Sequence, residues 1–306
     1  MKKSLYKIKQ EISSALLNNE PIVALESAVI THGLPQPINL NLAHELEDIV
    51  RQEGAIPATI ALLVGSIHIG LTSGELESLA SAKSPRKISR RDFGLAIANH
   101  LTGGTTVAGT IFAASQIGIK VFATGGIGGV HRDSKFDISA DLQLLANNQL
   151  IVVCAGAKAI LDLPATMEVL ETLGVPVIGY RTDEFPAFYS SKSGLGVDAR
   201  ADTPEKIAQI ALSHWDAGIN GSILVVVPPP QSTNMNSQEV EIALEKALTD
   251  ANQMHIHGSA ITPFLLQRMG EITNGKSLQT NLDLLKNNAK VASRVAKALV
   301  NLKSSN

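Results

Sequence analysis

The sequence contains one cysteine, Cys154, among its 306 residues. A chain with a single cysteine cannot form an internal disulfide, and so little cysteine is typical of proteins from reducing compartments. We therefore expect a cytoplasmic protein.

Long hydrophobic runs are also missing. The longest apolar stretches, at residues 150–157 and 222–227, fall far short of the roughly 20 residues that a membrane-spanning helix needs. In the first 19 residues, charges are spread among apolar residues at helical spacing, unlike the continuous apolar block of a signal peptide. This pattern predicts a surface helix there and no membrane association.

Neither sign of charge is in large excess. The chain has 26 lysines and arginines against 28 aspartates and glutamates, a formal net charge of -2. Such a balance gives no general attraction to polyanions and argues against nucleic acid as a partner. A local pocket for an anionic small molecule remains compatible with it.

What the sequence does have is a rich apolar core pattern, with 44% hydrophobic and 18% charged residues. Short β-branched runs alternate with longer amphipathic segments, which is typical of an α/β fold whose sheet is mostly parallel or mixed. The runs are at residues 21–27, 58–71, 120–126, 149–156, 175–182 and 221–230. No linker or internal repeat interrupts this pattern, so we expect residues 1–306 to form a single domain.

Two helix predictions are specific. Asp202 or Thr203 can cap a helix in which Pro204 takes the first position, and residues 277–301 read as one long closing helix. In folds with parallel strands the chemistry lies on loops that leave the carboxyl ends of the strands. The candidate site residues are therefore sought there.

Glu26 ends the first apolar run and is followed by a turn that contains His32. A carboxylate in this place is either part of a site or a helix cap, and His32 is a weaker candidate. A second strand leads into ATGGIGGVHRD, whose glycines let backbone N–H groups approach a ligand, although tight turns alone also use such glycines. The residues of interest are Gly125, Gly126, Gly128, Gly129, His131 and Arg132.

The segment KFDISADL carries Asp137 and Asp141 around Ser139. Carboxylates at this spacing suit Mg²⁺ or Mn²⁺, and Ser139 or Asp137 suits the N-cap of a helix beginning near Asp141 equally well. Another segment gathers basic side chains before a predicted helix, either as a grip for phosphate or as a solvated face. These side chains are Arg86, Lys87, Arg90 and Arg91.

Lys158 lies where the apolar run VVCAGA gives way to a predicted helix. Burial disfavours a charged ammonium and shifts lysine toward its neutral amine, which is a nucleophile. A lysine at a strand end also commonly extends outward to solvent, so the residue type alone leaves both interpretations open.

Taken together, PIVALESAVITHGLPQP, RKISRRDFG, GGTTVAGT, FATGGIGGVHRD, FDISADL, VVCAGAKAILDLPATMEVLETLGVPV and NGKSLQTNLDLLKNNA resemble the pseudouridine-5'-phosphate glycosidase family, also called indigoidine synthase A-like proteins. The resemblance covers nearly the whole chain. It implies a three-layer α/β/α sandwich around a large mixed, mostly parallel sheet, a homotrimer, and one Mn²⁺ per subunit. The implied reaction is reversible cleavage of pseudouridine 5'-phosphate to uracil and ribose 5-phosphate.

The resemblance also implies roles for individual residues. Glu26 becomes the proton donor, Lys158 the covalent nucleophile and Asp137 the metal ligand. The implied substrate contacts are Lys87, Val107, Ser139, Ala140, Asp141, His131 and Asn281.

The chemistry of a carbon-linked base gives a reason for the lysine. Ordinary glycosidases protonate an oxygen or nitrogen leaving group between two carboxylates, whereas uracil in pseudouridine leaves from carbon and requires an electron sink at the sugar. An imine of Lys158 with the ring-opened ribose supplies that sink. Two alternatives remain at this point: a class I aldolase-like sugar-phosphate lyase, and a non-catalytic protein that binds a sugar phosphate or nucleotide.

Overall fold

The computed structural model describes residues 5–132, 137–256 and 261–304. Within them, eleven strands pair into one mixed sheet in the order β1-β4-β3-β2-β7-β9-β13-β11-β12, with β6 joined to β3 and β5 joined to β6. These strands are β1 (Tyr6–Ile8), β2 (Ile22–Leu25), β3 (Ile56–Leu63), β4 (Ser66–Ile69), β5 (Arg86–Ile88), β6 (Gly103–Thr105), β7 (Val121–Ala123), β9 (Ile151–Cys154), β11 (Val177–Tyr180), β12 (Ala199–Ala201) and β13 (Ile223–Val226). A small antiparallel pair is formed by β8 (Val130–His131) and β10 (Leu161–Asp162).

The central strands are parallel, because β2 pairs in parallel with β3 and β7, and β9 pairs in parallel with β7 and β13. Every residue of β2, β9, β11 and β13 is buried. Strands covered on both faces read as continuous apolar runs, which is the pattern seen in the sequence. Only β3 pairs antiparallel within the large sheet as described, with β4 and β6.

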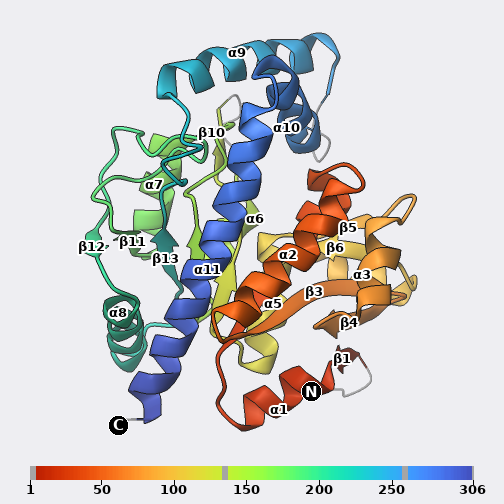
Figure 1. Ribbon diagram of the computed structural model, residues 1–306, viewed down its shortest axis with the longest axis vertical. Coiled ribbons are helices and arrows are strands. Elements are labelled where there is room, and N and C mark those ends of the chain that lie inside the picture. The colour runs from red at the N-terminus through yellow and green to blue at the C-terminus, as the bar shows by residue number, and fades with distance from the viewer. Residues whose placement is uncertain (1–4, 133–136, 257–260, 305–306) are drawn as a thin grey trace.

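Helices cover both faces of the sheet, so the predicted three-layer α/β/α sandwich is confirmed (Figure 1). The helices α2, α8 and α11 pack together on one face, and α5, α6 and α7 lie on the other, while α9 and α10 pack on each other at the top of the view. The α-helices are α1 (Gln10–Leu17), α2 (Ile38–Gln52), α3 (Ser73–Ala80), α4 (Phe93–Ala98), α5 (Val107–Ile117), α6 (Ala140–Ala146), α7 (Leu163–Thr172), α8 (Pro204–Asp216), α9 (Ser237–Gln253), α10 (Ile261–Ile272) and α11 (Lys276–Ser304). A π-helical turn, η1 (Val29–Gly33), and a 3₁₀ turn, η2 (Arg90–Asp92), complete the helical segments of the described residues.

Both specific helix predictions are confirmed. The Thr203 side chain accepts a hydrogen bond from the backbone N–H of Lys206, and Pro204 begins α8. The closing helix α11 runs 29 residues across the sheet, where it contacts β2, β7 and β9 (Figure 1).

Two predictions of local structure were wrong. The opening segment is not one helix, because Tyr6–Ile8 forms the edge strand β1 beside β4 before α1 begins. Residues 58–71 are not one strand, because the chain reverses at Val64 and Gly65 to form the β3–β4 hairpin, and both of these residues have positive φ angles. Both local structures depend on backbone pairing with the strand β4, and the hydrophobic pattern of a segment does not show which strand it pairs with.

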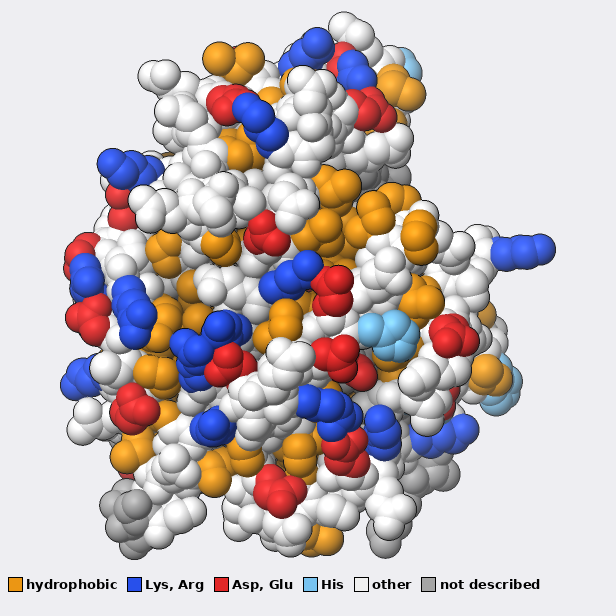
Figure 2. All heavy atoms as spheres, in the orientation of Figure 1, with side chains coloured by type: hydrophobic (Ala, Val, Ile, Leu, Met, Phe, Trp, Pro, Cys, Tyr) orange, Lys and Arg blue, Asp and Glu red, His pale blue; other side chains and the backbone are white. Residues whose placement is uncertain are grey.

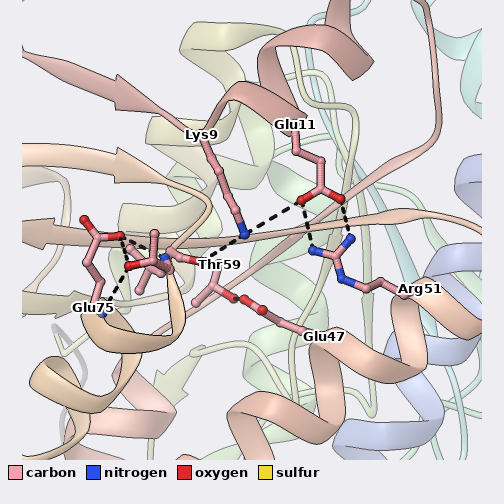
Figure 3. Close-up of polar contacts among 8 residues, drawn as sticks. Lys9, Glu11, Glu47, Arg51, Thr59 and Glu75 are labelled. Carbon is pink, nitrogen blue, oxygen red and sulfur yellow. Dashed lines mark hydrogen bonds and ion pairs between the residues drawn. The ribbon is translucent and has the colours of Figure 1, made fainter.

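Charged contacts tie this edge of the sheet to α2 (Figure 3). The Glu11 carboxylate accepts a hydrogen bond from each of the two terminal nitrogens of Arg51, and it lies 3.7 Å from the Lys9 ammonium. Below them, Thr59 donates a 2.5 Å hydrogen bond to Glu47. These contacts connect α1 and β3 to the same helix, α2.

The surface matches the near-neutral composition. Figure 2 shows lysine and arginine side chains interspersed with aspartate and glutamate on the face in view, rather than gathered by sign. None of the helices in the described part of the chain has the length and apolar character needed to cross a membrane.

The buried Asn288 of α11 connects this helix to the end of β7. Its side-chain amide donates a 2.8 Å hydrogen bond to the backbone carbonyl of Thr124. We expect Asn288→Leu to leave that carbonyl unpaired and to reduce the free energy of unfolding by about 1–3 kcal/mol, measured by urea denaturation.

The adjacent Asn287 provides the control, since it is partly exposed on the same helix. Asn287→Leu changes the same atoms and should stay within about 0.5 kcal/mol of the parent. An equal loss in both variants would show that the cost comes from the helix and not from the hydrogen bond to Thr124.

Candidate active site

Three neighbouring parallel strands deliver the central residues of the site. Glu26 follows β2, Thr124 follows β7, and Lys158 lies on the segment after β9. Leu25 pairs with Ala123 and Ala123 pairs with Val153, so the three strand ends lie at one edge of the sheet. The prediction that the strand-end loops carry the site residues agrees with this arrangement.

Glu26 occupies a partly buried position between charged neighbours. Burial is the main cause that raises the pKa of its carboxyl group above the ordinary value. The charge of Lys158 and a hydrogen bond from the Thr124 hydroxyl oppose that rise, whereas the negative charge of Asp141 adds to it. The raised pKa keeps Glu26 protonated to higher pH than a free glutamate, which suits a proton donor.

Two lysines face the same space. Burial, and then the positive charge of Lys158, lower the pKa of the Lys87 ammonium, while Glu26 and Asp141 act in the opposite direction. Within the described residues, neither lysine ammonium has a hydrogen bond or an ion pair. Both amines are therefore available to a ligand.

These side chains open onto a cleft of about 1210 Å³. Of the predicted basic cluster, Lys87 projects into the cleft and the exposed Arg90 and Arg91 line it. Arg86 also lines it, but its guanidinium forms a 2.8 Å ion pair with the buried Asp92. The cluster thus combines a structural ion pair with free cations that suit an anionic group.

Asp141, in the first turn of α6, connects this helix to α5 and to the glycine-rich loop that contains Gly128. Its carboxylate accepts one hydrogen bond of 2.8 Å from the N–H of Ala108, in the first turn of α5, and another of 2.7 Å from the N–H of Gly128. Ser139 caps α6 by accepting from the N–H of Asp141, so the capping interpretation of Ser139 is confirmed. A Cβ on Gly128 would collide with Ser139 and Asp141, which explains a glycine there.

Asp137 is exposed and lines the cleft. Within the described residues there is no group of three or more His, Cys, Asp or Glu side chains arranged to hold a metal. Asp141, the other carboxylate of this segment, already accepts hydrogen bonds on both oxygens. A lone free carboxylate fits a hard cation such as Mn²⁺ that keeps most of its water ligands, and it does not fit a zinc site of several protein ligands.

The other predicted contacts fall into two groups. His131, Ser139 and Ala140 line the open cleft with Asp141. Asn281, on α11, lines a separate smaller recess. The Val107 side chain is buried in the core at the first position of α5, so only its backbone can face a ligand.

The recess has a volume of about 80 Å³ and is mostly apolar. Glu26, Lys158 and Asn281 line it together with Phe188 and Tyr189, an aromatic pair that contacts edge to face with ring centroids 4.9 Å apart. Neither aromatic residue was predicted from the sequence, because both lie in the irregular segment between β11 and β12. Their only signal was an aromatic pair in a chain with 4% aromatic residues.

Phe188 has a backbone φ of 63°, in the left-handed region. A bulky residue in this region costs on the order of 1–3 kcal/mol and is held there only when its surroundings determine the conformation. Strained residues are common at binding and catalytic sites, so the conformation of Phe188 is consistent with a functional role for the recess.

Thr124 and Thr106 were also not predicted from the sequence. Thr124 hydrogen-bonds Glu26, and Thr106 caps α5 and lines both the cleft and the recess. Cys154 is excluded as a nucleophile, because burial raises the pKa of its thiol to about 12. The arrangement suits amine chemistry, with a carboxyl group of raised pKa beside the amine.

Comparisons with known proteins show which family the chain belongs to. The family model described as "Indigoidine synthase A like protein" matches residues 11–298. A pseudouridine-5'-phosphate glycosidase of Caldanaerobacter subterraneus is 50% identical over 94% of this chain and 95% of its own, and one of Geobacillus kaustophilus is 50% identical over 95% and 97%.

Two solved structures share the fold. One is the prealnumycin C-glycosynthase AlnA in complex with ribulose 5-phosphate, with a TM-score of 0.91 and 39% identity over 99% of both chains. The other is an indigoidine synthase A-like protein of Thermotoga maritima, with a TM-score of 0.89 and 35% identity over 97% of both chains. By sequence, fold and the coverage of its whole length, this chain belongs to the indigoidine synthase A-like family of pseudouridine-5'-phosphate glycosidases.

Proposed function

We propose that this chain cleaves the carbon–carbon glycosidic bond of pseudouridine 5'-phosphate reversibly, giving uracil and ribose 5-phosphate. Relatives with half of their residues identical over nearly the full length carry the name of that activity. A solved relative was captured with a pentulose phosphate. The observation that carries the proposal is the meeting of Glu26, with its raised pKa, and the unpaired Lys158 amine in one recess.

Glu26 begins the reaction by donating its proton to the ring oxygen of the ribose, and the bond from that oxygen to the anomeric carbon breaks. The neutral amine of Lys158 then adds to the anomeric carbon and gives up a proton to the Glu26 carboxylate. Covalent catalysis of this kind divides one difficult step into several easier ones.

Uracil leaves in the second half of the reaction. The lone pair on the Lys158 nitrogen forms an iminium as the carbon–carbon bond breaks, and the departing ring carbon takes up a proton from Glu26. Water then adds to the iminium and releases ribose 5-phosphate with the free amine. Over the whole cycle, one water is consumed and Glu26 returns to its protonated state.

The substrate phosphate lies in the open cleft, where Arg90, Arg91 and Lys87 supply positive charge. Asp137 would hold one Mn²⁺ per subunit. When bound, the cation supplies positive charge for fixing the sugar phosphate. Two further expectations stay predictions: assembly as a homotrimer, and a cytoplasmic location.

The covalent step has a direct test. Borohydride added during turnover should reduce the iminium and leave a pentose-phosphate adduct on Lys158, detected by mass spectrometry of the digested protein. Lys158→Ala should lose both the adduct and uracil release. Lys158→Arg should also be inactive, because a guanidinium stays protonated and cannot act as the amine.

Lys87→Ala is the matched control, because Lys87 lines the same cleft and recess. It should weaken substrate binding and still form the adduct on Lys158. An adduct on Lys87, or uracil release by Lys158→Ala near the parent rate, would contradict the assignment.

Asp137→Asn should weaken binding of Mn²⁺ at least about tenfold, since the cation loses its charged ligand. Calorimetric titration with Mn²⁺ alone measures this without depending on turnover. Glu245→Gln, at an exposed carboxylate of α9, serves as the control and should bind Mn²⁺ as the parent does. Equal Mn²⁺ affinity in parent and Asp137→Asn would place the cation elsewhere.

The pH dependence tests the role of Glu26. The Thr124 hydroxyl donates to the Glu26 carboxylate and so stabilises its ionised form. Thr124→Val removes that donor, and the pKa of Glu26 should rise further, because the ionised carboxylate loses a hydrogen bond that stabilises it. The protonated form then persists to higher pH, and the alkaline limb of kcat/KM should move upward.

Thr110→Val removes a buried hydroxyl that hydrogen-bonds the Thr105 hydroxyl and not the Glu26 carboxylate, and it should leave the pH profile unchanged. Glu26→Gln should abolish the limb along with most of the turnover. A downward shift in Thr124→Val would show that another group controls the alkaline limb.

A further inference from the structure

The site is divided into two compartments of different character. The open cleft carries the exposed arginines and Asp137, whereas the recess is mostly apolar and contains Glu26. Lys158, Lys87 and Thr106 line both compartments. A carbon atom bonded to Lys158 therefore lies at the junction, with one substituent directed to each compartment.

The polar cleft suits the sugar phosphate, and this leaves the recess for the group that departs from the same carbon. That group is a planar ring if the proposed function holds, and the inference rests on that function. The recess is small, about 80 Å³, so it selects by size as well as by polarity.

Phe188 forms an aromatic wall of this recess. A Cβ on Gly126 would lie 2.7 Å from Phe188 Cδ2 and 2.8 Å from Cε2, so the ring rests directly on the backbone of the glycine loop. The edge-to-face contact with Tyr189, with an interplanar angle of 85°, fixes the plane of the ring.

The backbone of this segment is held in its left-handed conformation by several hydrogen bonds. Phe188 donates to the carbonyl of Ala155 at 3.2 Å, just beyond β9, and Tyr189 donates to that of Ala187 at 2.8 Å. The strained residue is thus tied to the strand end that leads to Lys158. A ring needed only to fill the core does not require a strained backbone beside the reactive amine.

We propose that Phe188 is a base-binding residue whose ring face stacks on the planar base as the base leaves or enters the recess. Stacking of one base on an aromatic side chain is tolerant of ring substituents and depends on ring overlap. Gly126 contributes to this arrangement, because a Cβ at this position would collide with the Phe188 ring.

The experiment uses the reverse reaction, because its two substrates can be supplied separately. Ribose 5-phosphate alone forms the imine, trapped by cyanoborohydride at Lys158, and this step does not involve the base. The KM for uracil, measured at saturating ribose 5-phosphate, reports how well the recess binds the base. Phe188→Leu should raise that KM at least about tenfold with an unchanged rate of trapping.

Phe188→Tyr keeps the ring and should restore a KM for uracil near that of the parent. Phe185→Leu makes the same change at a fully buried ring three residues away that lines neither compartment, and it should leave the KM for uracil unchanged. Gly126→Ala places a Cβ against the Phe188 ring and should displace it. This variant should show the same rise in the KM for uracil, and it tests the proposal if Phe188→Leu does not fold.

An unchanged KM for uracil in Phe188→Leu or Gly126→Ala overturns the stacking proposal. So does a parallel loss of trapping and uracil affinity, since that outcome indicates general damage to the site. Failure of the parent enzyme to trap ribose 5-phosphate overturns the proposed covalent mechanism instead. Calorimetric titration of uracil into the parent and Phe188→Leu then decides the stacking without turnover, with tighter binding by the parent expected and equal binding contradicting it.

Discussion

The carboxylate of Asp141 is the contact on which the site depends. It accepts from the N–H groups of Ala108 and Gly128, and so holds the first turn of α5 and the glycine loop against the start of α6. At 6% exposure, it is shielded from the water that would compete for these hydrogen bonds. Without it, two backbone donors would lose their partners and the floor of the cleft would have no fixed position.

The same carboxylate alters the pKa values of two neighbouring side chains in the site. Its negative charge adds to the effect of burial in raising the pKa of Glu26, and it opposes the lowering of the pKa of Lys87. Two carboxylates and two amines therefore share one partly buried region, where each charge alters the protonation of its neighbours. The raised pKa of Glu26 suits the proton donor of the proposed reaction, because a proton donor must retain its proton to higher pH than an exposed glutamate does.

The sequence predicted the parts of the fold that follow from local patterns. Continuous apolar runs identified the buried parallel strands, and parallel strands bring their carboxyl ends to one edge, so Glu26 and Lys158 meet although they are far apart in the chain. The strand Tyr6–Ile8 and the reversal at Val64 were not predictable in this way. Each depends on backbone pairing with β4, and hydrogen bonds between distant segments leave no periodic trace in the sequence.

The recess could not be predicted either, because it too depends on contacts between segments that are distant in the sequence. Phe188 lies in an irregular segment, so no periodicity indicates which way its ring points, and its position depends on a hydrogen bond to Ala155 and on contact with Gly126. The strand-end position of Lys158 left its role open until the family resemblance was considered, whereas the aromatic wall of the recess could be identified only in the folded chain. Residues that act through regular elements can be inferred from sequence patterns, and residues on long loops cannot.

Division of the site into a polar cleft and an apolar recess also suits the chemistry of a carbon-linked base. In the proposed reaction, charge develops on the departing ring, and Glu26 in the recess is the group placed to protonate it. Hydrolysis of the iminium instead needs water, which reaches Lys158 from the open cleft. Because Lys158 lines both compartments, base departure and water attack in the proposed reaction use different sides of the same carbon.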